Sequence, residues 1–166
     1  MSAQPPSPAA SEPAAAAIGV LVVDDQLAVR EGLARLISCA AMPLRCISTA
    51  ATGAEALSKA ALMRPEVVVL DVDLAGEDGL ALIPQLKQTA GVLVLTSHGD
   101  PATRARACLL GASAFIEKHQ PAADLLGSVV AIGILRMRGE EAPVLHGPSS
   151  HPEVVAPSAV SVRLHP

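Results

Sequence analysis

Five short apolar runs constrain the fold of this chain more than any other feature of its sequence. They are rich in β-branched residues or very short, and Pro, Gly or Asp bounds them; they occupy residues 19–23, 44–47, 67–70, 92–95 and 114–116. Short, largely apolar runs of this kind are typical of strands that are buried on both faces of a sheet. We therefore expect five buried strands.

The segments between these runs have the period of amphipathic helices, with apolar residues three or four positions apart. Strict alternation of strands and helices requires right-handed crossovers and a parallel sheet. The sequence thus predicts an α/β protein, a doubly wound five-stranded parallel sheet with five helices, flavodoxin-like, in the strand order 2-1-3-4-5. The positions that define the five helices are Leu33, Leu36 and Ile37; Ala54, Leu57, Ala60 and Ala61; Leu80, Ile83 and Leu86; Ala102, Ala105 and Leu109; and Leu125, Leu126, Val129 and Val130.

Two residues affect the expected start and shape of the third of these helices. Asp78 precedes its apolar positions and is a candidate N-cap, because a carboxylate there accepts a bond from a free backbone N–H. Pro84 lies inside the helix, where it removes one backbone hydrogen bond. We expect this helix to be bent.

The composition indicates one folded domain with a tail at each end. The chain has 166 residues, 51% of them hydrophobic, which allows one domain with a sizeable core. Residues 1–17 are almost entirely Ala, Pro, Ser and Gln, without the basic start and apolar stretch of a secretory signal. Residues 139–166 are rich in Pro and Ser. We expect a disordered N-terminal segment at 1–17, a domain at 18–138 and a flexible C-terminal tail at 139–166.

Charge and cysteine usage exclude several classes of partner. The net charge of −4 argues against direct nucleic-acid binding, and no apolar run approaches the length of about 18 residues that spans a bilayer, so we expect no membrane partner. The three cysteines, Cys39, Cys46 and Cys108, lack CxxC spacing and indicate reduced thiols in a cytoplasmic protein. No metal-ligand spacing relates the five histidines, His98, His119, His146, His151 and His165, which we expect to be exposed.

Charged and hydroxyl residues follow four of the apolar runs, three of them directly. Asp24 and Asp25 follow the first run, Asp71 the third, Thr96 the fourth, and Lys118 comes shortly after the fifth. The carboxyl ends of parallel strands line one crevice, so these side chains should converge. Three carboxylates, a hydroxyl and an amine in one pocket indicate a site for a divalent metal and a phosphoryl group.

Four segments carry a family resemblance. Val22–Leu33, with its two acids, resembles the opening of a response-regulator receiver domain, especially the type joined to a LuxR-like helix-turn-helix, and Leu70–Leu80 resembles the phosphoacceptor segment of that family. Leu95–Ser97 and Gly111–Lys118 resemble its two remaining motifs. The segments occur in the family order and spacing, which is far more specific than any one of them.

The resemblance implies that Asp71 is the phosphoacceptor, which takes a phosphoryl group from a sensor histidine kinase or a phosphotransfer protein. Thr96 and Lys118 would then bind phosphoryl oxygens, and Phe115 would be the switch aromatic. The protein would be a phosphoacceptor that catalyses only its own phosphorylation and dephosphorylation, not an enzyme.

The resemblance also implies Mg²⁺ as the cofactor. Asp25, Asp71 and the backbone carbonyl of Asp73 would be direct ligands, and Asp24 would act through water. Asp73 departs from the family pattern by placing a further acid beside the phosphoryl group, and Ala75 stands where a proline is common.

Two other functions remain open at this stage. Asp71 and Asp73 also resemble the Asp-x-Asp of haloacid-dehalogenase-like phosphatases, although the core is small for such an enzyme. Alternatively, the chain is a transcriptional regulator without its DNA-binding domain, since only 28 residues follow Arg138 and no recognition helix fits there. We expect a stand-alone receiver that contacts a downstream protein, or a second copy of itself, through its fourth helix, fifth strand and fifth helix.

Overall fold

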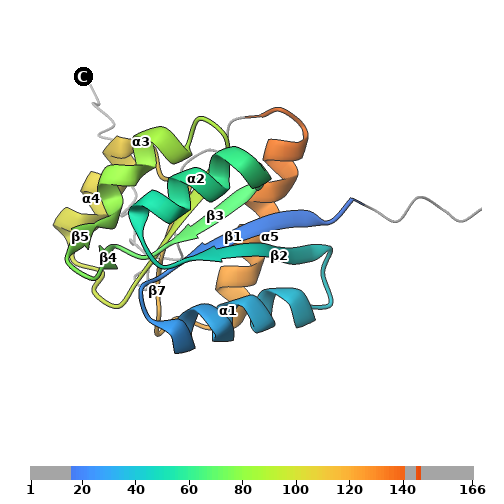
Figure 1. Ribbon diagram of the computed structural model, residues 1–166, viewed down its shortest axis with the longest axis horizontal. Coiled ribbons are helices and arrows are strands. Elements are labelled where there is room, and N and C mark those ends of the chain that lie inside the picture. The colour runs from blue at the N-terminus through green and yellow to red at the C-terminus, as the bar shows by residue number, and fades with distance from the viewer. Residues whose placement is uncertain (1–15, 141–144, 147–166) are drawn as a thin grey trace, which may run out of the picture.

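The computed structural model describes residues 16–140 and residues 145–146. Strands and helices alternate from Ile18 to Met137, so the predicted fold class is confirmed (Figure 1). Within these residues the helices are too short or too polar to cross a lipid bilayer. The elements are β1 (Ile18–Val23), α1 (Leu27–Cys39), β2 (Leu44–Ala50), α2 (Gly53–Met63), β3 (Val67–Leu70), β4 (Asp73–Leu74), β5 (Glu77–Asp78), the 3-10 helix η1 (Gly79–Leu82), α3 (Ile83–Leu86), β6 (Gly91–Thr96), α4 (Pro101–Leu110), β7 (Ala114–Glu117), α5 (Ala122–Met137) and β8 (Leu145–His146).

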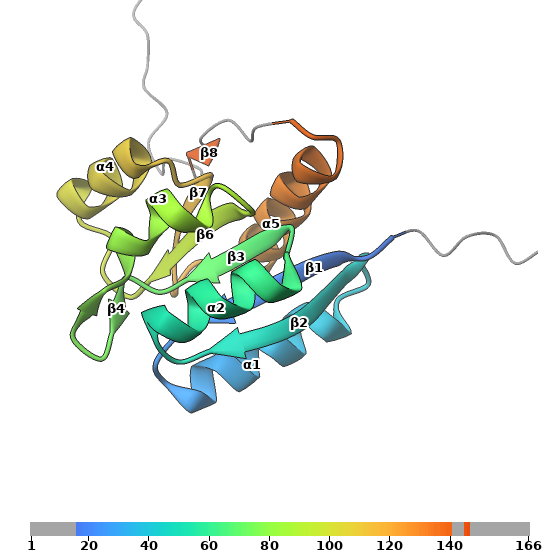
Figure 2. The same ribbon diagram turned by 45° about the horizontal axis from the view of Figure 1, so that its top comes forward.

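The main sheet has the strand order β2-β1-β3-β6-β7-β8. Its first five strands are parallel and are the five that the sequence predicts, in the predicted order, since β4 and β5 form a separate small hairpin. The sixth strand, β8, was not predicted. It pairs in parallel with β7 and lies inside the segment expected to be a flexible tail (Figure 2). Most of that tail, like residues 1–15, lies outside the described residues.

Alternate residues of each strand face opposite layers of helices. Leu21, Val68 and Val92 belong to a core cluster with α2, α3 and α4, which lie together on one side of the sheet (Figure 1). Val20 and Val69 belong to the cluster with α1 and α5 on the other side. Both faces of the inner strands are therefore buried, and the strand ends are the places where polar side chains can gather. The expected burial of β2 is wrong, because this edge strand is buried only at its two end residues, Leu44 and Ala50.

The third helical segment is broken, as Pro84 predicts. Gly79–Leu82 forms the 3-10 helix η1, and α3 is a single turn in which Pro84 stands near the start. Because proline has no N–H, it cannot donate to Leu80 in the α-helical pattern. Asp78 is the N-cap, as predicted, and its side chain accepts from the backbone N–H of Leu80 at 3.1 Å.

The fourth predicted helix is α4, but the apolar positions that define it do not lie on its buried side. Ala102, Ala105 and Leu109 are exposed, with Leu109 87% accessible, whereas Ala107 is buried. The reason is that Arg104 takes an inward position and covers Phe115 with its guanidinium group, 4.5 Å from the ring centroid. A long polar side chain can serve as a cover over apolar surface, so the apolar period of this helix does not mark its core side.

The hairpin β4–β5 has a two-residue turn, Ala75-Gly76, in which both residues have positive φ, +55° and +89°. Such turns match the twist of hairpin strands but strain any residue that has a Cβ. Proline, whose φ is fixed near −65°, could not occupy position 75 in this conformation. The departure from the family pattern at Ala75 therefore goes together with a tight hairpin.

Ala75→Gly should raise the free energy of unfolding. A left-handed conformation costs an L-residue about 1–2 kcal/mol, and glycine removes this cost. Glycine also makes the unfolded chain more flexible, which favours unfolding and offsets about half of the gain. We expect a gain of about 0.5–1 kcal/mol in urea unfolding followed by circular dichroism. Gly76→Ala, which meets no neighbouring atom but keeps a φ of +89°, should lower it. A loss of stability in Ala75→Gly would contradict the turn assignment.

Candidate functional site

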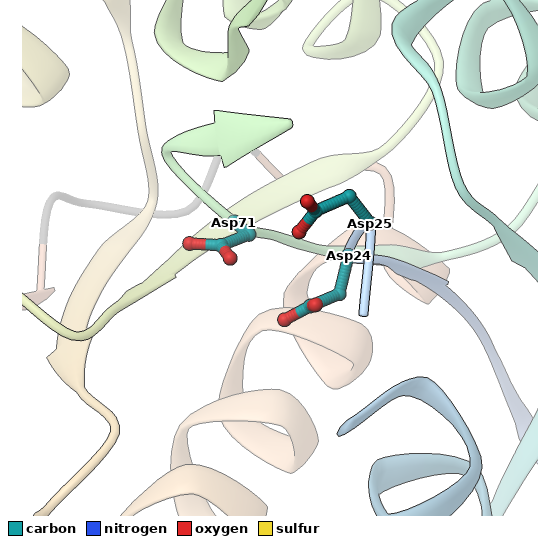
Figure 3. Close-up of side chains that lie close together, drawn as sticks. All are labelled: Asp24, Asp25 and Asp71. Atoms are coloured by element: carbon teal, nitrogen blue, oxygen red, sulfur yellow. The ribbon is translucent and has the colours of Figure 1, made fainter. Parts of the chain in front are cut away.

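Three carboxylates meet at the carboxyl end of the sheet. Asp24 and Asp25 directly follow β1, and Asp71 directly follows the neighbouring strand β3, so parallel pairing brings them together (Figure 3). One oxygen of each lies within 4.8 Å of the others. Asp24 and Asp71 are buried, with 1% and 7% of their surface accessible, and Asp25 is half-buried. The predicted convergence of these residues is confirmed.

Lys118 lies between two of the carboxylates. Its Nζ donates to Asp24 Oδ2 at 2.6 Å and to Asp71 Oδ2 at 2.8 Å. Its backbone N–H also donates to the carbonyl of Thr96 at 2.7 Å, which ties the ends of β6 and β7 together. Three carboxylates and one ammonium group leave two net negative charges in the pocket.

Burial and ion pairing act on these groups in opposite directions. Burial raises the pKa of Asp71, although Lys118 opposes the rise with its hydrogen bond and charge. Burial lowers the pKa of Lys118, but its bonds to Asp24 and Asp71 outweigh that effect, so the pKa is raised overall. Lys118 is therefore a fixed cation, and Asp71 is a carboxylate whose charge the surroundings do not fully satisfy.

The donor set suits a hard divalent cation. Both oxygens of Asp24 are already engaged, by the backbone N–H of Gln26 at 2.9 Å and by Lys118. One carboxylate oxygen of Asp71 accepts from the backbone N–H of Val72 at 2.7 Å, and the other accepts from Lys118 Nζ. Among residues 16–140 the Asp25 carboxylate accepts no hydrogen bond, which leaves it the most available ligand. Mg²⁺ takes oxygen ligands of this kind and keeps several waters.

The other predicted site residues occupy distinct places. Thr96 is buried at the end of β6, where its hydroxyl donates to the carbonyl of His98 at 3.2 Å and accepts from that residue's N–H. Phe115 is buried in β7 under Arg104. Asp73 is exposed, and its carboxylate accepts from the N–H of Gly76 at 3.0 Å, so it caps the hairpin turn and is not part of the three-carboxylate cluster.

The histidines whose side chains are described, His98 and His119, are exposed as expected. His119 Nδ1 lies 3.4 Å from Glu117 Oε2. Tail histidines 146, 151 and 165 fall outside the described side chains. The three cysteines are free thiols.

Sequence reasoning missed Arg30 of α1. Its Nη1 donates to the backbone carbonyls of Asp24 at 2.8 Å and Asp25 at 2.9 Å. Because these acceptors are main-chain atoms, which every residue has, the sequence contains no side-chain pattern that would predict the contact. The only signal was the place of Arg30 inside the Val22–Leu33 segment, shortly after the acidic pair.

Comparisons of the sequence and of the structure with known proteins point to the same family. The family model described as the response regulator receiver domain matches residues 20–130. The transcriptional regulatory protein LnrK of Bacillus subtilis is 35% identical over 118 residues, which are 69% of this chain and 53% of LnrK. The chain thus spans about half the length of the curated relatives it matches.

Two solved structures show the same fold. A two-component response regulator of the LuxR family from Aurantimonas superposes with a TM-score of 0.67 and 29% identity, covering 75% of this chain and 88% of that one. The complex of CheX and CheY with BeF₃⁻ and Mg²⁺ from Borrelia burgdorferi contains a chain that superposes with a TM-score of 0.63 and 25% identity, covering 69% of this chain and 88% of that one.

The raised pKa of Asp71 gives a pH test of the site. Because the pKa of Asp71 is higher in the folded than in the unfolded protein, protonation of Asp71 stabilises the fold. This contribution is complete below the unfolded-state pKa near 4, and it is lost as the pH rises through the folded-state pKa. Asn cannot ionise, so the stability of Asp71→Asn relative to wild type should increase from about pH 4 to about pH 7 in metal-free buffer. Urea unfolding at each pH measures this difference.

Asp100→Asn is the matched control, and the expected trend is opposite. Hydrogen bonds from Thr103 lower the pKa of Asp100, the N-cap of α4, so ionised Asp100 contributes stability above its unfolded-state pKa. The mutant should therefore lose stability relative to wild type as pH rises. A pH-independent difference for Asp71→Asn would show that its carboxylate is not destabilised by burial.

Proposed function

The chain belongs to the response regulator receiver domain family, and from this we propose that Asp71 accepts a phosphoryl group from a sensor histidine kinase or a phosphotransfer protein. The main support is the convergence of Asp24, Asp25 and Asp71 around Lys118 at the strand ends. Two net negative charges in a largely buried pocket favour a divalent cation, and the neutral pocket that results can receive a phosphoryl dianion.

The chemistry we propose is a single displacement at phosphorus. A carboxylate oxygen of Asp71 forms a bond to phosphorus as the bond from phosphorus to the donor nitrogen or oxygen breaks, and the donor leaves with that electron pair. Lys118 turns from the Asp71 carboxylate toward the phosphoryl oxygens, and the Thr96 hydroxyl leaves the backbone of His98 to donate to one of them. Lys118 already contacts the reacting carboxylate before the reaction, and Thr96 ends β6, the strand next to β3.

The metal ligands we propose are Asp25, Asp71 and the backbone carbonyl of Asp73, with Asp24 acting through water. Bound Mg²⁺ would neutralise charge on the phosphoryl oxygens. The free carboxylate of Asp25 supports its place as a direct ligand. Asp24 and Asp71 both have their two oxygens engaged, so the division between these two rests on the family resemblance. An ion that binds Asp25 and Asp71 directly would leave the Asp24–Lys118 pair intact.

The same groups account for self-catalysed transfer, and we propose no further enzymatic activity. The family match favours a receiver over the haloacid-dehalogenase-like phosphatase. The side chain of Asp73, which would have to be the general acid and base of such a phosphatase, is engaged at the hairpin turn.

For the output we propose protein contact through α4, β7 and α5, with a downstream target or with a second copy of the chain. The exposed side chains of Ala102, Ala105 and Leu109 form an apolar stripe on α4. An apolar stripe of this kind offers a surface for a protein partner. The edge of β7 carries β8, so backbone pairing on this face is already in use between described residues.

Phosphorylation of the full chain by acetyl phosphate tests the reaction. We expect intact-mass spectrometry to show one added phosphoryl group on wild type, none on Asp71→Asn, and none on wild type in excess chelator, because the nucleophile or the charge neutralisation is then missing. Asp73→Asn, which changes an exposed carboxylate two residues away, should still be labelled. Equal labelling of Asp71→Asn would refute the assignment.

The switch can be followed on a single ring. The chain contains one Phe and no Tyr or Trp, so its aromatic proton signals other than those of histidine belong to Phe115. We expect BeF₃⁻ with Mg²⁺ to shift these signals, because movement of Thr96 opens space beside the ring. Asp71→Asn should show no shift under the same conditions. Unchanged Phe115 signals in a wild-type sample that binds BeF₃⁻ would show that this ring does not report the switch.

A further inference from the structure

Arg30 makes an unusual contact with the acidic pair. The half-buried side chain projects from the start of α1, and a single nitrogen, Nη1, donates to two successive backbone carbonyls, those of Asp24 and Asp25. These are the two residues whose carboxylates stand on the β1 side of the pocket. A guanidinium group is always charged and presents its donors in a rigid plane, so it can fix the direction of both carbonyls at once.

Apart from Arg30, Asp24 has several hydrogen-bonding partners, whereas Asp25 has none among the described residues. Asp24 is tied by its N–H to the carbonyl of Ala50 at 3.1 Å and by its side chain to Gln26 and Lys118. For Asp25, the bond from Arg30 is the hydrogen bond that the described structure provides. The orientation of Asp25, the carboxylate most available to a cation, therefore depends on Arg30.

We propose that Arg30 is a positioning residue of the metal site, which holds the Asp24–Asp25 backbone so that the Asp25 carboxylate is oriented before the ion arrives. The proposal rests on the proposed function, because it takes Mg²⁺ as the ion. Arg30 touches neither the ion nor the phosphoryl group. Residues that orient metal ligands typically change affinity 10–100-fold when they are lost.

Two effects of replacing Arg30 have opposite signs. Removing a cation from the neighbourhood of the pocket favours Mg²⁺, whereas loss of orientation means that Asp25 must be ordered when the ion binds. Because the guanidinium points at carbonyl oxygens and its charge is partly solvated, we expect the orientation effect to dominate. A purely structural role would lower stability and leave Mg²⁺ affinity unchanged or stronger.

The test is Mg²⁺ titration of the full chain by calorimetry, since the chain has no Trp or Tyr for intrinsic fluorescence. Arg30→Gln should raise the Kd for Mg²⁺ by about 10-fold. Arg30→Lys, which keeps the charge but not the planar donor group, should give an intermediate Kd and remains usable if Arg30→Gln does not fold. Arg35→Gln is the matched control, because Arg35 is exposed on the same helix and its replacement changes net charge equally.

A second readout does not involve the metal. In metal-free buffer, hydrogen exchange at residues 24–26 should be faster in Arg30→Gln than in Arg35→Gln, whereas exchange in β3 should be the same in both. An Mg²⁺ Kd for Arg30→Gln equal to or lower than that of Arg35→Gln would overturn the role of Arg30. Absence of Mg²⁺ binding in wild type would overturn the proposed metal site as well, so the two failures are distinguishable.

Discussion

The ion pairs of Lys118 with Asp24 and Asp71 are the interaction on which the rest of the pocket depends. Two carboxylates about 4 Å apart repel by roughly 4 kcal/mol at an effective dielectric of 20, and this site holds three within a few ångströms. One ammonium group relieves only part of that repulsion. The protein without metal is therefore less stable than a neutral pocket would make it, and a bound divalent cation would relieve the remaining repulsion.

The doubly wound sheet explains why this charge gathers where it does. Strands buried on both faces offer no solvated side on which acids can stand, so the chain can place them only where a strand ends and a loop begins. Parallel pairing of β1, β3, β6 and β7 brings those ends to one edge. The backbone bond from Lys118 to Thr96 then fixes the amine and the hydroxyl relative to each other. Packing of the core and assembly of the site are thus consequences of the same strand register.

Sequence could predict the features that depend on burial and on strand order. The five apolar runs locate five strands, and the residues that follow them locate the carboxylates, Thr96 and Lys118. Prediction from the sequence failed where a residue occupies a position or conformation that is unusual for its type. Arg104 occupies an inward position of α4, so the apolar period there marked the solvent side, and Ala75 adopts a positive φ that nothing in its side chain signals.

Contacts between side chains and backbone are also hidden in a sequence. The bonds of Arg30 go to carbonyl oxygens, which every residue has, and the approach of Lys118 to Asp24 depends on the exact height at which β1 and β7 end. The resemblance placed Lys118 toward the phosphoryl group and did not place it between two carboxylates. Its position between them is nevertheless what neutralises part of the pocket in the metal-free protein.

The link from the pocket to α4 runs through β7. Arg104 lies over the ring of Phe115 and also binds Glu117, the residue before Lys118, at 3.3 Å. A cation–π contact at a partly exposed site contributes about 0.5–1 kcal/mol and a solvent-accessible ion pair about 0–1 kcal/mol, so these two contacts together hold α4 to β7 by roughly 0.5–2 kcal/mol. A hydrogen bond from Thr96 to a charged phosphoryl oxygen is worth about 1.5–3 kcal/mol. The two quantities are of the same size, so under the proposed phosphorylation one new bond at the pocket would be enough to outweigh these two contacts between α4 and β7. Stronger contacts at Arg104 would lock the helix, and weaker ones would let it move without a phosphoryl group.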